Sequence, residues 1–246
     1  TPLYSSAASD VYKRQLIYAP GDYASTEELT ELSKVASEYG GMYISHLRSE
    51  GTNLLEALEE LISISRNANI PAEVYHLKAS REPNWSKLDD VIKRIEEVRK
   101  EGLKITADIY TYNASSTGLT GVIPTWVQEG GHRAWINRMK DPEVRPRLLA
   151  DIREQLDEQP PEGILLVGFK TSKMSRKYLA KTVAEAAAMR GQTPEEAIVD
   201  MVIEDDHRIQ CIYFSMSEDN IRKKIQLPWV SFCSDCLLYT SDAADE

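Results

Sequence analysis

The sequence predicts an α/β fold with a parallel β-sheet, and three observations support this prediction. Short apolar segments alternate with amphipathic helical segments along most of the chain. The chain has 246 residues, close to the ~250 residues of one complete (β/α)8 barrel. No glycine-rich phosphate loop follows any expected strand. The alternation fits both a (β/α)8 barrel and a doubly wound open sheet, and the lack of a phosphate loop favours the barrel.

The first helix is predicted by signals at both of its ends. Ser25 is a suitable N-cap, and Glu28 follows three residues later, as in a capping box. Apolar residues then recur at helical spacing: Leu29, Leu32, Val35, Ala36 and Tyr39. The pair Gly40-Gly41 ends the helix, because glycine accepts the left-handed turn. A short buried strand is expected at 42–46.

The same cycle recurs further along the chain. Helices are expected around 54–62 and 88–98, with Ser86 as the cap of the second. Two later helices start near Thr193, with Glu196 completing a capping box, and near Ser217. Further strands are expected at 72–76, 104–108, 164–168, 209–214 and 229–234. The segment 111–142 is expected to be a long irregular loop, the kind of segment that often carries a site.

Two of the four histidines occupy equivalent places in this alternation. His46 and His76 each close an expected strand, one strand–helix unit apart. In a barrel, neighbouring strands end on one rim, where active sites form. Imidazole is a good zinc ligand, so the pair predicts a metal site, although either histidine alone would more simply pack at a strand end. His132 and His207 lack such a placement and are expected on the surface.

A carboxylate closes the last expected strand. Asp235 follows the apolar run Trp229-Val230-Ser231-Phe232. At that position it can act as general base on a metal-bound water and then as acid toward a leaving amine. An ordinary loop aspartate that caps a following helix fits the position equally well.

Polar side chains near the expected rim could bind a substrate. Lys78 lies two residues after His76, so strand alternation places both on one face, and Tyr110 and Ser116 follow the strand 104–108. A cationic amine, a phenol and a hydroxyl near a metal can hold a carboxylate or polarise a carbonyl. Each of these residues alone also fits a solvated loop position.

Two charged residues close to the first histidine are expected to have a structural role. Arg48 and Glu50 lie two and four positions after His46. We expect them to form an ion pair with each other that supports the rim.

Composition excludes several classes of partner. The formal net charge of −10 leaves no basic surplus for nucleic acid or an anionic membrane surface. No run of eighteen apolar residues is present that could span a membrane. The three cysteines, Cys211, Cys233 and Cys236, have no framework spacing, so structural disulfides are not expected. A reducing compartment, the cytoplasm, is therefore expected.

Taken together, these motifs resemble the N-acyl-D-amino-acid deacylase (D-aminoacylase) family of the amidohydrolase superfamily. The similar stretches are LIYAPGDYAS (16–25), YISHLRSEG (43–51), EVYHLKAS (73–80), ADIYTYNASSTGL (107–119), IYFSMSE (212–218) and PWVSFCSD (228–235). They are spread over nearly all of 16–235. The two spaced histidines with the following lysine are specific as a set, whereas a lone Ser-Asp at a strand end is a weak signal.

The resemblance implies zinc-dependent hydrolysis of the amide bond of N-acyl-D-amino acids by a (β/α)8 TIM-type barrel with a small β-sandwich. By matched position, His46 and His76 would be zinc ligands and Asp235 the catalytic acid/base. Lys78, Tyr110 and Ser116 would hold the substrate. The alternatives are a cyclic-amide hydrolase of the dihydroorotase or hydantoinase kind, or a catalytically dead barrel that serves as a binding module.

The chain also departs from the family pattern. An early His-x-His pair and a cysteine ligand would lie before Leu16, and Cys236 follows Asp235 where a glycine is usual. Residues 1–15 and 236–246 resemble translated adapter sequence at the two ends of a fragment. We therefore expect 16–235 to form a partial barrel without the early strands and the β-sandwich. The chain as written is expected to be inactive.

Overall fold

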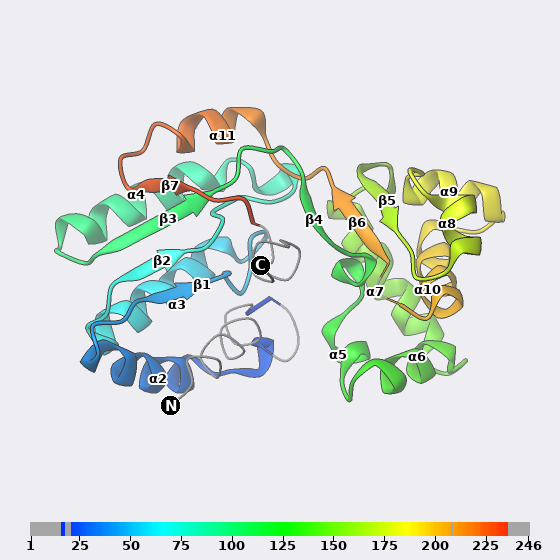
Figure 1. Cartoon of the computed structure of the whole chain (residues 1–246), viewed down its shortest axis with the longest axis horizontal. Helices are drawn as coiled ribbons and strands as arrows, with labels where there is room; N and C mark the ends of the chain where they lie inside the picture. Colours follow the sequence, from blue (N-terminus) through cyan, green and yellow to red (C-terminus); the bar gives the residue numbers. More distant parts are fainter. Residues whose placement is uncertain (1–15, 18–20, 208, 236–246) are drawn as a thin grey trace, which may run out of the picture. The chain divides into compact units, whose positions relative to one another are not determined.

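A computed structural model describes residues 16–17, 21–207 and 209–235, so both predicted tails lie outside the described residues. The chain divides into two compact units (Figure 1). Unit 1 comprises the described parts of Thr1–Ser80, Asn84–Tyr112 and Ser217–Glu246. Unit 2 comprises Arg81–Pro83 and Asn113–Met216, and thus most of it is inserted between two segments of unit 1.

Unit 1 is built on a four-stranded parallel sheet. Its strands are β1 (Tyr43–Ser45), β2 (Ala72–Val74), β3 (Ile105–Ile109) and β7 (Val230–Phe232), in the order β1-β2-β3-β7 (Figure 1). Every neighbouring pair is parallel, so all four strands end at the same edge of the sheet. The predicted α/β class and parallel sheet are confirmed for these four strands.

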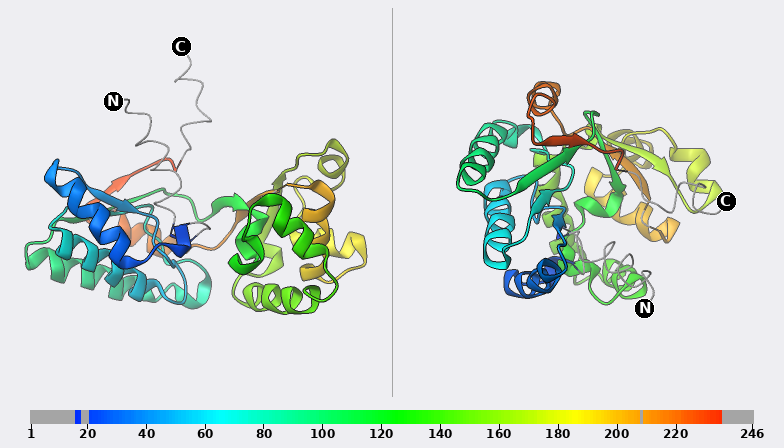
Figure 2. Two further views of the ribbon diagram at one scale, coloured as in Figure 1. Left: turned by 90° about the horizontal axis from the view of Figure 1, so that it is seen from below. Right: turned by 60° about the vertical axis from the view of Figure 1, so that its left-hand side comes forward.

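Helices join consecutive strands of this sheet. The helical segments of unit 1 are η1 (Gly21–Tyr23), α2 (Thr26–Glu38), α3 (Leu54–Ala68), α4 (Lys87–Lys100) and α11 (Glu218–Lys224), and η2 (Glu82–Asn84) begins in unit 2. The apolar faces of α3 and α4 share one core with β2 and β3. In Figure 2 these helices follow one side of the unit 1 sheet. The opposite face of the sheet is partly polar, since Thr106 of β3 donates a hydrogen bond of 2.7 Å to Glu73 of β2.

Helix α2 begins where the sequence predicts, but the face that it buries differs from the predicted one. The Ser25 side chain accepts a hydrogen bond of 3.1 Å from the Glu28 backbone, as predicted. Of the predicted apolar stripe, only Leu29 is buried, whereas Leu32, Val35 and Tyr39 are exposed. The helix packs through a different face, whose buried residues are Leu29, Thr30 and Ser33. Thr26 at the start of α2 also donates a hydrogen bond of 2.7 Å to Glu60 of α3.

Unit 2 contains a separate antiparallel sheet, which corrects a prediction. Strands β4 (Ser115–Gly118), β5 (Ile164–Gly168) and β6 (Gln210–Tyr213) have the order β4-β6-β5. The expected strands 164–168 and 209–214 do form, but they pair antiparallel with each other and not with the sheet of unit 1. The polar strand β4, which alternation does not reveal, pairs antiparallel with β6. A short apolar run encodes an extended conformation but not the direction of its partner.

Helices surround this second sheet. The helical segments of unit 2 are η3 (Leu119–Val122), α5 (Thr125–Gln128), α6 (His132–Lys140), α7 (Arg145–Glu158), η4 (Pro161–Gly163), α8 (Ser172–Tyr178), α9 (Val183–Arg190) and α10 (Pro194–Asp205). The segment 111–142 is therefore not an irregular loop, because Val127, Trp135 and Met139 within it join the core of unit 2. The predicted capping box at Thr193 is present at the start of α10.

The described helices contain no segment that meets the length and hydropathy needed to span a membrane.

Candidate metal centre

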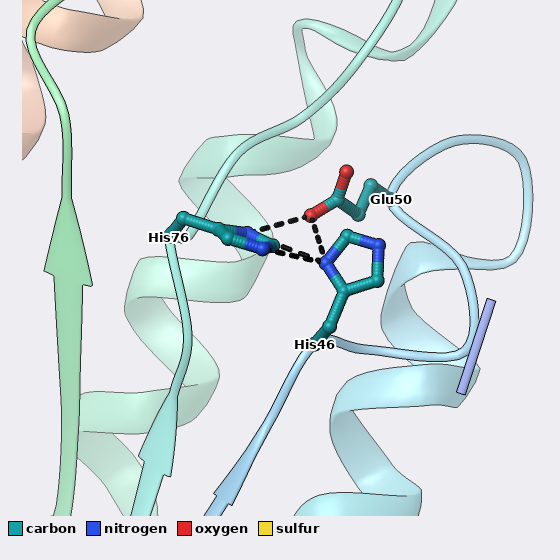
Figure 3. Close-up of side chains that lie close together, drawn as sticks. All are labelled: His46, Glu50 and His76. Carbon is teal, nitrogen blue, oxygen red and sulfur yellow. Dashed lines mark hydrogen bonds and ion pairs between the residues drawn. The ribbon is translucent and has the colours of Figure 1, made fainter. Parts of the chain in front are cut away.

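The two strand-end histidines of unit 1 lie side by side. His46 directly follows β1, and His76 follows the neighbouring strand β2 by two residues. Both side chains are buried, and His46 Nδ1 lies 2.8 Å from His76 Nε2 and 3.4 Å from His76 Nδ1 (Figure 3). The predicted placement of both imidazoles at one edge of the sheet is confirmed.

A third donor, Glu50, points into the same place from the loop before α3. Its Oε1 lies 3.2 Å from His46 Nδ1 and 3.1 Å from His76 Nδ1 (Figure 3). The same oxygen accepts a hydrogen bond of 2.7 Å from Lys78 Nζ. Within the described residues, the ligand atoms of His46, Glu50 and His76 form a group that could hold a metal ion.

Glu50 does not pair with Arg48, contrary to the sequence-based expectation. Arg48 instead binds Glu60 of α3 through two hydrogen bonds, of 3.0 and 2.9 Å. It also donates to the backbone carbonyls of Asp22 and Ala24, at 2.8 Å each. The expected ion pair between Arg48 and Glu50 is therefore wrong, and Arg48 instead connects the segment after β1 to Glu60 of α3. In the sequence, Glu50 lies in a charged segment after the expected strand, as many surface residues do. Nothing in this pattern therefore indicates that its side chain lies beside the two histidines.

Electrostatics favour the ligand forms of two of these groups. Burial, aided by His76 and Lys78 and opposed by Glu50, lowers the pKa of His46 to about 3, so its ring is neutral at pH 7. Burial alone would raise the pKa of Glu50. His46, Lys78 and His76 outweigh that effect and hold this pKa below its usual range, so the carboxylate stays ionised. A neutral imidazole and an ionised carboxylate are the forms that bind a metal ion.

The turn that carries His76 is held by three backbone contacts. His76 has a positive φ of 40°, which a non-glycine residue rarely adopts. Its N–H donates to the carboxylate of buried Asp108, at the end of β3. The next N–H, of Leu77, donates to the Asp108 carbonyl at 2.8 Å, and Lys224 Nζ donates to the Leu77 carbonyl at 2.7 Å. Asp108 and Lys224 are positioning residues that the sequence analysis missed.

Lys78 and Tyr110 lie beside the histidines, as expected. Lys78 Nζ is 2.6 Å from His76 Nδ1 and 5.3 Å from the centre of the Tyr110 ring. The ring centroids of Tyr110 and His76 are 6.3 Å apart. Lys78 and Tyr110 are both buried, which places a cation and a phenol next to the group of metal-ligand atoms.

Asp235 lies within electrostatic reach of this centre. It follows β7 in a left-handed conformation, with φ of 53°, and is exposed. Partial burial of its carboxyl, with the charges of Glu50 and Asp108, raises its pKa, and His76 and Lys78 oppose this change. The hydrogen bond of 2.9 Å from the Cys233 backbone to the Ile109 carbonyl ties this segment to β3.

Ser116 belongs to the other unit. It lies in β4, where its hydroxyl donates a hydrogen bond of 3.3 Å to the Cys211 carbonyl. The remaining histidines are exposed, as predicted, and His132 contacts Asp206 at 2.9 Å. Cys211 is buried in unit 2, where burial raises its pKa to about 12, so its thiol is not poised as a metal ligand.

Comparisons with known proteins agree with the resemblance. No family model matches the chain. Over 102 residues, the chain is 33% identical to an N-acyl-D-glutamate deacylase and 34% identical to a D-aminoacylase, both of Alcaligenes xylosoxydans xylosoxydans. Each match covers 42% of this chain and 21% of the relative. The matched part thus spans about a fifth of each curated relative.

Two solved structures share the fold. The N-acyl-D-glutamate deacylase of Bordetella bronchiseptica, complexed with zinc and a phosphonate inhibitor, matches with a TM-score of 0.67 at 23% identity. That match covers 96% of this chain and 43% of the solved chain. A D-aminoacylase structure described as defining a subset of amidohydrolases matches with a TM-score of 0.64 at 24% identity, over 91% and 38% of the two chains.

Proposed function

We propose that this chain, a relative of the N-acyl-D-amino-acid deacylases, is part of a zinc-dependent hydrolase that cleaves the amide bond of N-acyl-D-amino acids. The observation that carries the proposal is the group of buried donors at the ends of neighbouring parallel strands, with His46 Nδ1 2.8 Å from His76 Nε2. Active sites of barrel enzymes occupy this edge of the sheet.

His46 and His76 would hold the zinc ion. The donor set fits such an ion, because imidazole nitrogens and a carboxylate oxygen are ordinary zinc ligands. When bound, zinc supplies a water of lowered pKa and polarises the substrate carbonyl. The turn held by Asp108 and Lys224 keeps the His76 ring in position for this task.

Asp235 is proposed as the proton carrier. Its carboxylate takes a proton from the attacking water and passes it to the nitrogen of the leaving amine, so that the C–N bond breaks with a neutral amine as product. In the metal-free chain, burial of its carboxyl raises its pKa above the ordinary value.

Lys78, Tyr110 and Ser116 are proposed to hold the substrate. The Lys78 ammonium is buried beside the Tyr110 ring, where it could pair with the carboxylate of the amino acid. In a site that excludes water, such a pair is stronger than on the surface. The role of Ser116 rests on its place in the matched stretch 107–119.

We further propose that β1, β2, β3 and β7 are consecutive strands of a (β/α)8 barrel in 16–235, with the early strands and the β-sandwich outside this range. Four parallel strands in this order, with α3 and α4 on one face, support this proposal. The partly polar opposite face would line the interior of the barrel. The cytoplasm remains the predicted compartment.

The test uses the complete protein, expressed from the uninterrupted gene. Purified protein with zinc should release acetate from N-acetyl-D-methionine or N-acetyl-D-glutamate, but not from the L-enantiomers. His46→Ala and His76→Ala should each lose zinc and activity, and His132→Ala is the matched surface control. Asp235→Asn should lower kcat by at least ~10²-fold with zinc retained. Two results would contradict the proposal. One is hydrolysis of dihydroorotate or hydantoin without any hydrolysis of N-acyl-D-amino acids, and the other is normal turnover by either histidine variant.

A further inference from the structure

We infer that Arg81 is a positioning residue for Lys78, because it anchors the end of the loop that carries Lys78 to unit 2. This inference rests on the proposed function, in which the Lys78 ammonium pairs with the carboxylate of the substrate. Arg81 would act on the substrate only through Lys78, which lies three residues earlier in the chain.

The loop that carries Lys78 begins and ends at residues with a positive φ. His76 has a φ of 40°, and Arg81 has a φ of 72°. A non-glycine residue rarely adopts this conformation, which persists only where the surrounding structure determines it. The carboxylate of Asp108 holds the backbone at the His76 end of the loop. Contacts of Arg81 itself hold the other end.

Arg81 is held through both its backbone and its side chain. Its N–H donates a hydrogen bond of 2.7 Å to the carbonyl of Ser215, two residues after β6. Its guanidinium donates to Gln155 Oε1 at 3.2 Å through both terminal nitrogens, and to Glu158 Oε2 at 2.9 Å. Gln155 and Glu158 lie three residues apart on α7, so both face the guanidinium. The Arg81 side chain is 21% exposed, so water and salt screen this ion pair only in part.

The anchored residue belongs to unit 2, although its neighbours in the sequence belong to unit 1. Unit 2 includes the short segment Arg81–Pro83, and the chain on both sides of this segment is part of unit 1. On the unit 1 side, the N–H of Ser80 donates a hydrogen bond of 2.7 Å to the Glu50 carbonyl. Lys78 therefore lies in a loop whose backbone is held at His76, at Ser80 and at Arg81.

The backbone conformation at position 81 does not itself require an arginine. Glycine adopts a positive φ without the steric cost that a side chain brings. The hydrogen bonds to α7, in contrast, need the long guanidinium side chain. The variant Arg81→Gly therefore removes the anchor while the backbone conformation stays accessible, and it separates the two effects.

An ordered loop should help Lys78 to bind the substrate carboxylate. Fixing the backbone of one residue corresponds to a ~5–30-fold change in an equilibrium constant at 25 °C. This cost does not fall on substrate binding when the loop is already ordered. Loss of the anchor should therefore raise KM. It should leave kcat and zinc content as they are, because Asp108 holds His76 without Arg81.

The experiment measures the steady-state kinetics of the complete protein with zinc and N-acetyl-D-methionine or N-acetyl-D-glutamate. Arg81→Gly should raise KM by ~5–30-fold and leave kcat unchanged. Arg81→Lys keeps the positive charge but not the fork of donors, so it should recover part of the loss. In a Lys78→Met background, Arg81→Gly should have no further effect on KM, because Arg81 acts through Lys78.

Two variants elsewhere in unit 2 test whether the contact with α7 is the cause. Glu158→Gln removes the ion pair without any change at position 81, and it should raise KM by a smaller factor because Gln155 remains. Arg145→Ala is the matched control, since it removes an ion pair of 2.8 Å with Asp200 within unit 2 but leaves the loop untouched. Its KM should equal that of the original protein. Circular dichroism establishes that each variant is folded.

Amide hydrogen exchange gives a second readout that does not depend on catalysis. Peptides that cover residues 77–84 should exchange faster in Arg81→Gly than in the original protein, because the end of the loop opens more often. Peptides from β3 should keep their exchange rates, since this strand lies in the sheet of unit 1.

The outcomes separate this inference from the proposed function. An unchanged KM or unchanged exchange of 77–84 in folded Arg81→Gly would overturn the inference, and so would an equal rise in KM in the Lys78→Met background. The deacylase proposal would stand in each of these cases, because the original protein would still hydrolyse the substrate. If the original protein hydrolyses no N-acyl-D-amino acid, the proposed function is wrong. Faster exchange in Arg81→Gly would then still support the anchoring of the loop by Arg81.

Discussion

The carboxylate of Asp108 accepts a hydrogen bond from the backbone N–H of His76, at the residue where the chain after β2 turns into the left-handed region. This contact joins the ends of β2 and β3, and it fixes the direction in which the His76 ring leaves the sheet. A rigid ring position lowers the cost of assembling a metal centre, because the ligand is already oriented.

Removal of this contact should weaken the centre and the fold together. Asp108→Ala leaves a buried N–H without its acceptor, which costs ~1–3 kcal/mol in the free energy of unfolding. Zinc affinity should fall by ~10–100-fold. Asp108→Asn keeps an oxygen acceptor and should recover part of both losses. Zinc titration and urea unfolding measure the two effects, with exposed Asp89→Asn as control. Unchanged zinc affinity in Asp108→Ala would show that His76 needs no such support.

Acid should destabilise unit 1 through His46. Because the pKa of His46 is lowered to about 3 from its ordinary 6.5, the unfolded chain binds more protons between these values. The stability that this group contributes is therefore present above pH 6.5 and decreases as the pH falls toward 3. Urea titration without metal measures how much unfolding free energy is lost between pH 6.5 and pH 5. This loss should be smaller in His46→Gln than in the original chain, and unchanged in the surface variant His132→Gln. An equal loss in both variants would contradict this account.

Alkali should have the opposite effect through Lys224. Burial, with the repulsion of Lys78, lowers the pKa of Lys224 to about 8 from its ordinary 10.5, although Glu50 opposes this change. Between these values the unfolded chain binds more protons, so the contribution of this group to stability rises with pH. The difference in unfolding free energy between the original chain and Lys224→Met should change by a few kcal/mol, on the order of 1.4 kcal/mol per pKa unit, from pH 8 to 10.5.

The neighbouring lysine provides the control for that measurement. Lys223 is exposed and pairs with Asp89 at 2.7 Å on the surface. Lys223→Met should leave the pH dependence of the unfolding free energy as it is in the original chain. If Lys224→Met also leaves it unchanged, the Lys224 ammonium is not buried in solution.

The buried face of α2 can be tested with two leucines of one helix. Leu29 is 5% exposed, whereas Leu32 is 48% exposed. Leu29→Ala should lower the free energy of unfolding by about 2–5 kcal/mol, as core truncations do. Leu32→Ala should change it by no more than about 0.5 kcal/mol. Thermal or urea unfolding measures both changes. Similar losses of unfolding free energy in the two variants would show that Leu32 is buried too, as the apolar spacing in the sequence predicts.

The sequence by itself determined the features that depend on near neighbours in the chain. The N-cap hydrogen bond of Ser25 and the capping box at Thr193 form as predicted, because they link residues three positions apart. The predicted cap at Ser86 is wrong, since its side chain makes no capping hydrogen bond to α4. The spacing of His46 and His76 equals one strand–helix unit, so the parallel pairing of β1 with β2 brings both to one edge of the sheet. Sequence reasoning could therefore identify these two histidines, and the neighbouring Lys78, before the fold was known.

Tertiary structure alone decided which strands share a sheet and which charges meet. Strands β5 and β6 are as apolar as those of unit 1, yet they pair antiparallel, because pairing direction depends on the whole path of the chain between them. Likewise, Arg48 lies two residues from Glu50 but binds Glu60, leaving Glu50 to face His76 and Lys78. Long charged side chains can adopt many rotamers. Which of these they adopt depends on the charged groups that the fold brings near them from distant parts of the sequence.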